Sequence, residues 1–274
     1  MDRDPVPTLP RPVEALVDRI AGGGPTLVAL SGGVDSSAVA SLAHRALGAR
    51  ALAATVVSRS VSPEEIAAAR TAAAAIGIAH RLVDGEPLAD PRYRQNGPDR
   101  CYRCRSVETA ALVAVGRSVG SRQYLDGIQL DDLGDDRPGV RAMDEAGFRH
   151  PFLWAGWSKA DVRRYARAAG LPNWDRPSNA CLASRVARGE PITGELLDRV
   201  GQAETMLLDL GFRRVRVRWR SGAATVEVGG EETSRLERPE LRRTIEDALR
   251  ALGFATVSFD PVGYPRRESL RVVP

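Results

Sequence analysis

The feature that most constrains the fold is a short apolar run followed at once by small residues. Residues 26–30 are nearly all apolar, as expected for a strand buried on both faces. The run Ser31-Gly-Gly-Val-Asp-Ser-Ser37 follows, and a helical pattern begins within it. Glycines let a backbone approach an oxyanion closely, and unpaired N–H groups at a helix start point toward it. The run therefore predicts a strand, an anion-binding loop and a helix.

We assign this loop to phosphate binding. Its predicted contacts come from hydroxyls and from close backbone approach, and they are Ser31, Gly32, Gly33, Ser36 and Ser37. Asp35 is expected to act structurally or through a metal ion, since two anions repel. No lysine follows the glycines, so the loop is not of the G-x-x-x-x-G-K-[ST] type. A polar turn that merely caps a helix is the alternative interpretation, and the complete seven-residue run favours the phosphate site.

Strands and helices alternate along the first part of the chain. Strands are predicted at 26–30, 51–57, 80–83 and 124–128, and helices at 13–20, from 34 to Gly48, from Ser62, at 104–119 and at 158–170. This order indicates βαβ units and a parallel sheet, whose ligands bind at the carboxyl ends of the strands.

The pattern changes near residue 190. A helix at 193–210, strands at 213–220 and 224–228, a helix around 241–249 and a strand at 255–259 predict a small α+β domain. The hypothesis is a large α/β domain in residues 1–190 and a smaller one in residues 191–274, which serves substrate binding or oligomerisation.

Composition narrows the classes of partner. No apolar run approaches the roughly 18 residues of a membrane span, and residues 1–12 lack the apolar stretch of a secretory signal, so we expect a cytoplasmic protein without a membrane partner. The basic excess is small, with 39 Lys and Arg against 35 Asp and Glu, and nearly all the basic residues are arginine. This mild charge, with 5% aromatic residues, argues against a nucleic-acid partner.

The seven-residue loop resembles the signature of the PP-loop ATP pyrophosphatases. That resemblance implies an adenine nucleotide alpha hydrolase-like fold and cleavage of ATP between its α and β phosphates, which adenylates a substrate. The acceptor is left open by the loop alone.

Further segments are similar to the LarE family, the ATP-dependent sulfur transferases of nickel-pincer nucleotide biosynthesis. The similarity extends over about residues 13–270, and its pieces are Cys101-Tyr-Arg-Cys104, Asp126-Gly127, the acidic stretch 131–139, the segment 176–185 around Cys181, Arg214-Val-Arg-Val-Arg218 and Gly263-Tyr264. It implies that ATP with Mg²⁺ adenylates a carboxylate of a pyridinium biscarboxylate mononucleotide. Cys181 matches the sulfur-delivering cysteine.

The three cysteines leave the sulfur source open. Some members of the family sacrifice the one cysteine sulfur, whereas others hold a [4Fe-4S] cluster on three cysteines, matched here by Cys101, Cys104 and Cys181. Three thiolates leave one iron open for hydrosulfide. A zinc site would need a fourth ligand, and among the histidines His44 and His80 fit packing roles better.

The resemblance also assigns the remaining contacts. Gly127 belongs to the nucleotide site. Asp131 or Asp132 is a candidate oxygen ligand for Mg²⁺, and a solvated loop carboxylate is the alternative. The predicted substrate contacts are Arg105, Arg185, Glu204, Arg216 and Arg218, with Glu204 orienting the arginines. A solvated strand face is the alternative for the arginine row. Gln129 and Arg105 depart from the commoner Asn and Lys.

Two other functions stay open at this point. A PP-loop RNA thiolase would also use ATP and cysteines, but it predicts a concentrated basic surface. An ATP-binding module without catalysis leaves the three cysteines unexplained. The resemblance further implies a homo-oligomer.

Overall fold

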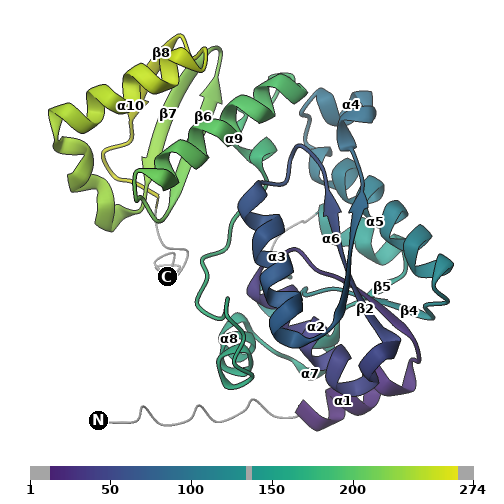
Figure 1. Cartoon of the computed structure of the whole chain (residues 1–274). Coiled ribbons are helices and arrows are strands. Elements are labelled where there is room, and N and C mark those ends of the chain that lie inside the picture. The colour runs from purple at the N-terminus through teal and green to yellow at the C-terminus, as the bar shows by residue number, and fades with distance from the viewer. Residues whose placement is uncertain (1–12, 134–137, 265–274) are drawn as a thin grey trace, which may run out of the picture. The chain divides into compact units, whose positions relative to one another are not determined.

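The computed structural model describes residues 13–133 and 138–264 (Figure 1). The chain forms two compact units. The first comprises the described residues up to Tyr93 with Asp99–Asn179, and the second comprises Arg94–Pro98 with the described residues from Ala180 onward. The break between the units thus falls at residues 179 and 180, and the domain boundary at 190 stays a prediction. Asp135, Asp136 and Arg137 of the acidic stretch lie outside the described residues.

A parallel sheet forms the centre of the first unit, which confirms the predicted α/β class. Within the described ranges its five strands follow the order β3-β2-β1-β4-β5. They are β1 (Thr26–Ala29), β2 (Ala51–Val57), β3 (Ala79–Asp84), β4 (Gln123–Leu125) and β5 (Phe148–Arg149). The chain moves outward from β1 through β2 to β3, then returns to place β4 on the other side of β1. Ligands bind at such a switch point in parallel α/β sheets.

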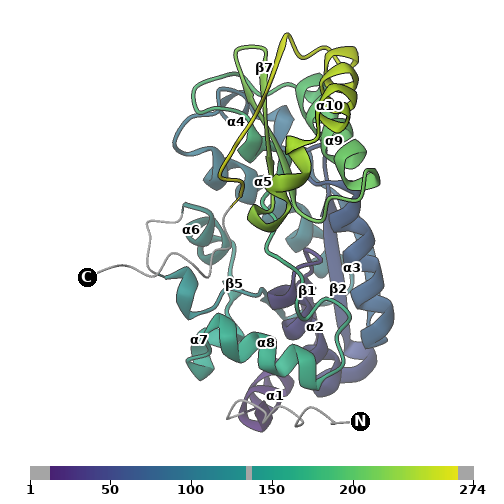
Figure 2. The same ribbon diagram turned by 90° about the vertical axis from the view of Figure 1, so that its left-hand side faces the viewer.

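Helices cover both faces of this sheet (Figure 2). One core cluster joins the sheet to α1 (Val13–Gly22), α2 (Val34–Leu47), α3 (Pro63–Ile76), α7 (Pro151–Ala155) and α8 (Lys159–Ala168). A second cluster, on the other face, includes Leu112 of α5 (Arg100–Ser118) and Met143 of α6 (Pro138–Glu145). A four-residue helix, α4 (Pro91–Arg94), precedes α5. The apolar strands are therefore buried on both sides, as their composition predicts.

Local signals explain the helix ends that matter for the site. Pro63 occupies the first turn of α3, and Gly77 ends that helix in the left-handed conformation. Ser158 and Asp161 form a capping box at the start of α8. The sequence patterns did not predict α6, α7 or β5, which are short and follow a polar stretch.

The second unit is a small α+β fold, as predicted. Strand β6 (Val215–Arg220) pairs antiparallel with β7 (Ala223–Val228), which pairs in parallel with β8 (Thr256–Phe259). Its helices are α9 (Gly194–Asp209) and α10 (Pro239–Ala251). Ser221 and Gly222, both with positive φ, make the tight turn between β6 and β7. None of the helices in the described ranges has the length and apolarity to cross a lipid bilayer.

Candidate nucleotide and substrate sites

Backbone geometry shapes the loop between β1 and α2. Gly32 has φ +84°, and a Cβ there would lie 2.5 Å from the carbonyl oxygen of Glu65 on α3. Gly127, just after β4, is as confined, because its Cβ would lie 2.6 Å from the amide nitrogen of Ser36. Glycine is therefore required at both positions. The close approach at Gly127 sets the end of β4 directly against the first turn of α2.

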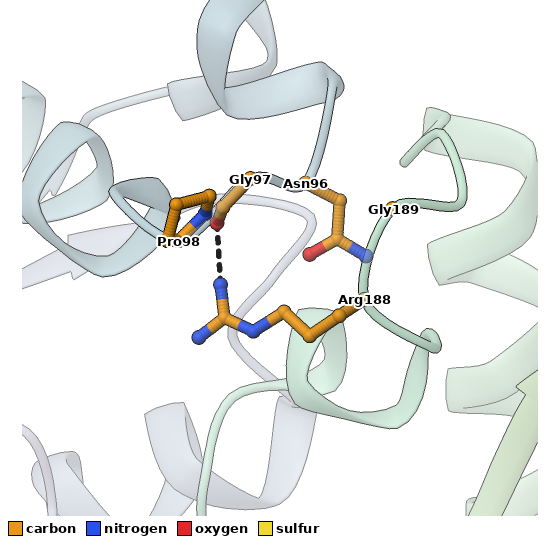
Figure 3. A pocket seen from close by; sticks show the side chains of 5 residues that line it. All are labelled: Asn96, Gly97, Pro98, Arg188 and Gly189. Carbon is orange, nitrogen blue, oxygen red and sulfur yellow. Dashed lines mark hydrogen bonds between the residues drawn. The ribbon is translucent and has the colours of Figure 1, made fainter.

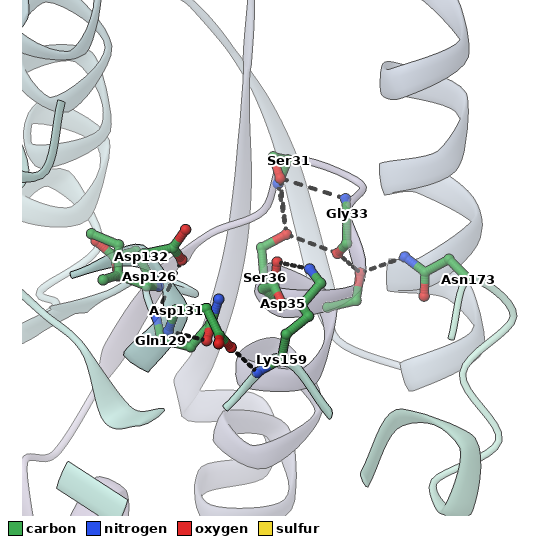
Figure 4. A network of polar contacts seen from close by, with 12 residues as sticks. Ser31, Gly33, Asp35, Ser36, Asp126, Gln129, Asp131, Asp132, Lys159 and Asn173 are labelled. Carbon is green, nitrogen blue, oxygen red and sulfur yellow. Dashed lines mark hydrogen bonds and ion pairs between the residues drawn. The ribbon is translucent and has the colours of Figure 1, made fainter. Parts of the chain in front are cut away.

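The loop's hydroxyls bind the loop itself (Figure 4). Ser36 Oγ donates to the Gly33 carbonyl at 3.1 Å, and Ser37 Oγ donates to the same oxygen at 2.9 Å. The Ser31 amide donates to Ser36 Oγ at 3.1 Å. These bonds hold the loop in one conformation, so the serines predicted as phosphate donors have a structural role in the loop.

The amide end of α2 is open. Gly33 is the N-cap and gives no side-chain cap. The N–H groups of Val34, Asp35 and Ser36 have no hydrogen-bond acceptor among the described residues. Three converging donors and the positive end of the helix dipole favour an anion. This group is the strongest binding feature of the first unit.

Asp35 forms an ion pair with Lys159 at the start of α8. The other carboxylate oxygen of Asp35, Oδ1, is buried and has no hydrogen-bond partner in the described part of the chain. Burial raises the pKa of Asp35, and the neighbouring Lys159 only partly offsets that rise. The sequence analysis did not identify Lys159, which lies far from the loop along the chain.

The segment after β4 carries the residues assigned to Mg²⁺. Asp131 Oδ2 accepts a hydrogen bond from the Lys159 amide at 2.6 Å, and Asp132 Oδ2 accepts one from the Gln129 amide at 3.3 Å. The Gln129 side chain in turn accepts from the Asp131 amide at 2.8 Å. Both carboxylates are thus oriented by backbone donors within a short 3₁₀ turn, Leu130–Asp132.

A chain of charged side chains lies at the end of β4. His150 Nδ1 is 2.7 Å from Asp126 Oδ1, and His150 Nε2 is 2.7 Å from Asp144 Oδ1. Burial alone lowers the pKa of His150, but the hydrogen bonds and charges of Asp126 and Asp144 outweigh it and raise that pKa to about 9. A protonated His150 therefore joins the residue before Gly127 to α6.

Two further side chains brace the loop, and the sequence analysis missed both roles. Asn173 Nδ2 donates to the Gly32 carbonyl at 2.8 Å and to Ser37 Oγ at 2.9 Å. Arg176 forms an ion pair with Glu65 of α3, with nitrogen and oxygen 2.6 Å apart. Their segment follows α8, and no local pattern indicates that it returns to the loop.

Two of the cysteines lie on α5 in the first unit. Cys101 and Cys104 are half-buried, and the Cys104 thiol donates to Glu108 Oε1 at 3.3 Å. Arg105, predicted to bind substrate, forms an ion pair with Glu108 at 2.8 Å. Spacing of three residues places both cysteines on one helix face.

Cys181 is exposed and belongs to the second unit. Across residues 13–133 and 138–264, no three His, Cys, Asp or Glu side chains are grouped in a way that could hold a metal ion. The cluster on all three cysteines stays a prediction.

Arg185 and Glu204 form a buried ion pair in the second unit. Arg185 Nε lies 2.7 Å from Glu204 Oε1, and Nη2 lies 3.0 Å from Oε2. The Val217 amide of β6 also donates to Glu204 Oε1, at 3.0 Å. Arg185 Nη1 donates to the Ala180 and Cys181 carbonyls at 2.8 and 3.3 Å. Glu204 thus fixes Arg185, and Arg185 holds the backbone that carries Cys181.

The arginine row on β6 is unevenly neutralised. Arg218 forms two parallel contacts with Glu227 of β7, at 2.9 and 3.0 Å. Arg216 is buried and stacks on the ring of Tyr264, 3.7 Å from its centroid, and no described carboxylate pairs with it. Burial first, and then the charge of Arg185, lowers the pKa of Arg216 to about 10. Arg216 is therefore the cation of this row best placed to receive an anion.

The second unit also contains an open pocket of about 490 Å³ (Figure 3). It is lined by Asn96, Gly97, Pro98, Arg188 and Gly189, and Arg188 donates to the Gly97 carbonyl. None of the predicted site residues lines this pocket.

The open α2 amides at the switch point of a parallel sheet define a PP-loop nucleotide-binding protein. Residues 13–93 match the asparagine synthase family model. An uncharacterized protein of Synechocystis is 40% identical over 90% of this chain and 92% of its own length. The pyridinium-3,5-bisthiocarboxylic acid mononucleotide synthase of Lactiplantibacillus plantarum is 32% identical over 86% of each chain. An uncharacterized protein of Methanocaldococcus jannaschii is 28% identical over 49% of this chain and 52% of its own. The chain therefore belongs to the LarE family of PP-loop proteins.

Proposed function

We propose that this chain is an ATP-dependent sulfur transferase. It adenylates a carboxylate of pyridinium-3,5-biscarboxylic acid mononucleotide, releases pyrophosphate, and converts the carboxylate to a thiocarboxylate. The observation that carries the proposal is the set of unpartnered amides of Val34, Asp35 and Ser36 at the sheet's switch point. Similarity to a synthase of the bisthiocarboxylic acid mononucleotide supports the choice of acceptor.

The substrate carboxylate must be activated before sulfur can replace one of its oxygens. A carboxylate is a poor electrophile because its leaving group would be oxide, whereas an acyl adenylate loses AMP. One carboxylate oxygen becomes the bridge to the α phosphate, and pyrophosphate departs. Hydrogen-bond donors that already point at the negative charge of the transition state lower the activation barrier, because they need not move during the reaction. The amides of the braced loop are such donors.

The residues present fit a Mg²⁺ ion that arrives with the nucleotide. The buried Oδ1 of Asp35 has no partner among the described residues, and Asp131 and Asp132 are oriented nearby in the segment after β4. Mg²⁺ is commonly held by one or two carboxylates together with substrate phosphates, so a preformed protein cage is not needed. The ion would offset phosphate charge as pyrophosphate leaves.

Cys181 is the proposed sulfur-bearing residue. Its thiol is exposed, and the buried Arg185 secures its backbone, so the nucleophile is presented on a fixed turn. Attack by the thiolate on the adenylate forms a thioester and releases AMP. In the sacrificial route, a base removes the Cα proton of residue 181 and the Cβ–S bond breaks, so the sulfur leaves on the substrate as a thiocarboxylate and dehydroalanine remains at position 181.

Cys101 and Cys104 support the alternative sulfur source within the same function. With Cys181 they supply three thiolates, and a [4Fe-4S] cluster, when bound, would carry a hydrosulfide on its fourth iron. Iron and acid-labile sulfide, measured on protein purified without oxygen, separate the two routes. Iron near four per chain that is lost in Cys104→Ser supports the cluster. Absence of iron after anaerobic reconstitution leaves Cys181 as a sacrificial donor.

The second unit is proposed to receive the anionic groups of the substrate. Arg216 is buried and carries no carboxylate partner in the described residues, whereas Arg218 is already paired. We retain residues 191–274 as a substrate or oligomerisation domain and the chain as a homo-oligomer. Light scattering during gel filtration tests the assembly.

The enzyme class is tested by the products of ATP. Incubation with ATP, Mg²⁺ and the biscarboxylate should give AMP and pyrophosphate in equal amounts, with a thiocarboxylate as the third product. ADP with phosphate, or no turnover without RNA, would contradict the proposal.

A further inference from the structure

The cation paired with the loop at Asp35 is the only lysine in the chain. All the other members of the 39 Lys and Arg residues are arginines. Exposed positions usually accept either lysine or arginine, and this sequence has arginine at every basic position except 159. The single exception lies beside the amide end of α2, which points to a requirement for an ammonium at Lys159.

The backbone of Lys159 is fixed while its side chain stays partly exposed. Its amide donates to Asp131 Oδ2 at 2.6 Å, and the Ser158–Asp161 capping box holds the first turn of α8. The side chain pairs with Asp35 and remains 27% exposed (Figure 4). The ammonium can therefore keep Asp35 on one side and accept a second partner on the other.

Lys159 supplies a positive charge where a phosphate at the α2 amides would approach Asp35, in addition to any Mg²⁺ that arrives with the nucleotide. Asp35 is the second residue of α2, so its carboxylate would stand next to the bound anion. Its Oδ1 is buried and has no partner among the described residues. Two anions repel, so the ammonium of Lys159 would lower the cost of placing a phosphate beside Asp35.

We infer that Lys159 is a phosphate-binding residue of the nucleotide site, whose ammonium lies between Asp35 and the nucleotide phosphates and contacts both. This inference rests on the proposed function and deepens it. An ammonium is a compact point charge with three donors, so it can serve two anions at once. A guanidinium would instead commit its planar fork to the two oxygens of Asp35.

The single lysine gives a direct spectroscopic test. Reductive methylation with isotope-labelled formaldehyde marks Lys159 and the α-amine, keeps their charge, and assigns Lys159 by loss of its signal in K159R. Addition of α,β-methylene ATP, which resists cleavage, should move the Lys159 methyl resonance along the same saturation curve as equilibrium dialysis. Adenosine should leave it in place. Arg164→Lys adds a second labelled amine on the same helix, and its resonance should not move.

Affinity measurements complete the test. Lys159→Ala should weaken binding of α,β-methylene ATP about tenfold or more, since a charge-assisted contact is lost. Lys159→Arg should weaken it too, and both variants should bind adenosine as the parent chain does, which shows an intact site.

The outcomes separate this inference from the proposed function. Binding of the analogue with an unmoved Lys159 resonance, or full affinity in Lys159→Arg, would overturn the inference alone. Failure of the unsubstituted chain to bind the analogue at all would overturn the proposed function with it.

Discussion

The two units present their candidate anion sites through different chemical groups. In the first, the binding feature is made by backbone amides, and side chains such as Ser36, Ser37 and Asn173 are used to brace them. In the second, the feature is the arginine row, in which Arg214 and Arg218 pair with carboxylates and Arg216 has no carboxylate partner in the described part. A site made of backbone amides depends on the position of the backbone. A site made of guanidiniums depends on which arginines lack a carboxylate partner. Substitutions that act on one kind should spare the other.

The largest effect is expected from removing the buried partner of Arg185. Glu204→Ala leaves a fully buried guanidinium uncompensated and frees the Val217 amide, so the free energy of unfolding should fall by about 3–5 kcal/mol. Chemical denaturation measures it. Glu246→Ala, which removes a long, exposed contact to Arg250 on α10, should cost less than about 0.5 kcal/mol. Equal losses would break the distinction between buried and exposed pairs.

The next effect concerns His150. Its pKa is raised from 6.5 to about 9 in the folded chain, so its stabilising contribution is full below pH 6.5 and disappears as pH rises through about 9. The contribution is about 3 kcal/mol at one pKa unit per 1.36 kcal/mol. Unfolding free energies at about pH 6 and about pH 10 should differ by this amount.

His150→Gln should flatten that pH dependence, and His44→Gln, which leaves both carboxylate contacts of His150 intact, should retain it. An unchanged slope in His150→Gln would assign the dependence to other groups.

Gly127→Ala should cost about 100-fold in the rate of pyrophosphate release. A Cβ 2.6 Å from the Ser36 amide nitrogen must displace the first turn of α2, and misplacement by about 1 Å is enough for such a loss. Gly22→Ala is the matched control, because a Cβ there meets nothing within 4 Å. Full activity in Gly127→Ala would show that the amide geometry is not what the reaction uses.

The smallest expected effect is on substrate affinity in the second unit. Arg216→Ala should raise KM for the biscarboxylate about tenfold with kcat little changed, since a contact made equally in ground and transition states is lost. Arg220→Ala, at the exposed end of the same strand, should leave KM unchanged. If KM rises in Arg220→Ala and not in Arg216→Ala, the anion would bind at Arg220 and the assignment to Arg216 would be wrong.

Short-range patterns predicted most of the fold. The helix starts at Ser62 and Ser158, the loop after β1 and the strand β6 are predicted by signals that act within a few residues, and these elements appear in the structure. The capping box forms at Ser158, whereas the Ser62 side chain makes no capping hydrogen bond and burial along β6 does not alternate strictly. The elements between residues 138 and 155 escaped prediction because they are short and are stabilised by packing on the sheet and on α5.

The site was predictable only in part, for the same physical reason. Gly32 and Gly127 are marked by their own backbone requirements. Lys159, Asn173 and Arg176 reach the loop from more than a hundred positions away, and only the tertiary structure brings them there. Glu204 was expected to orient arginines, but no pattern indicated that Arg185 would take both of its oxygens.

Transfer of a carboxylate oxygen to AMP tests the central claim most directly. The substrate's carboxylates would be labelled with heavy oxygen, and AMP from a single turnover analysed by mass spectrometry. If the carboxylate is adenylated and sulfur then displaces AMP, each AMP formed with thiocarboxylate should carry one labelled oxygen. AMP without label, in amounts matching the thiocarboxylate, would contradict adenylation of the carboxylate and the account built on it.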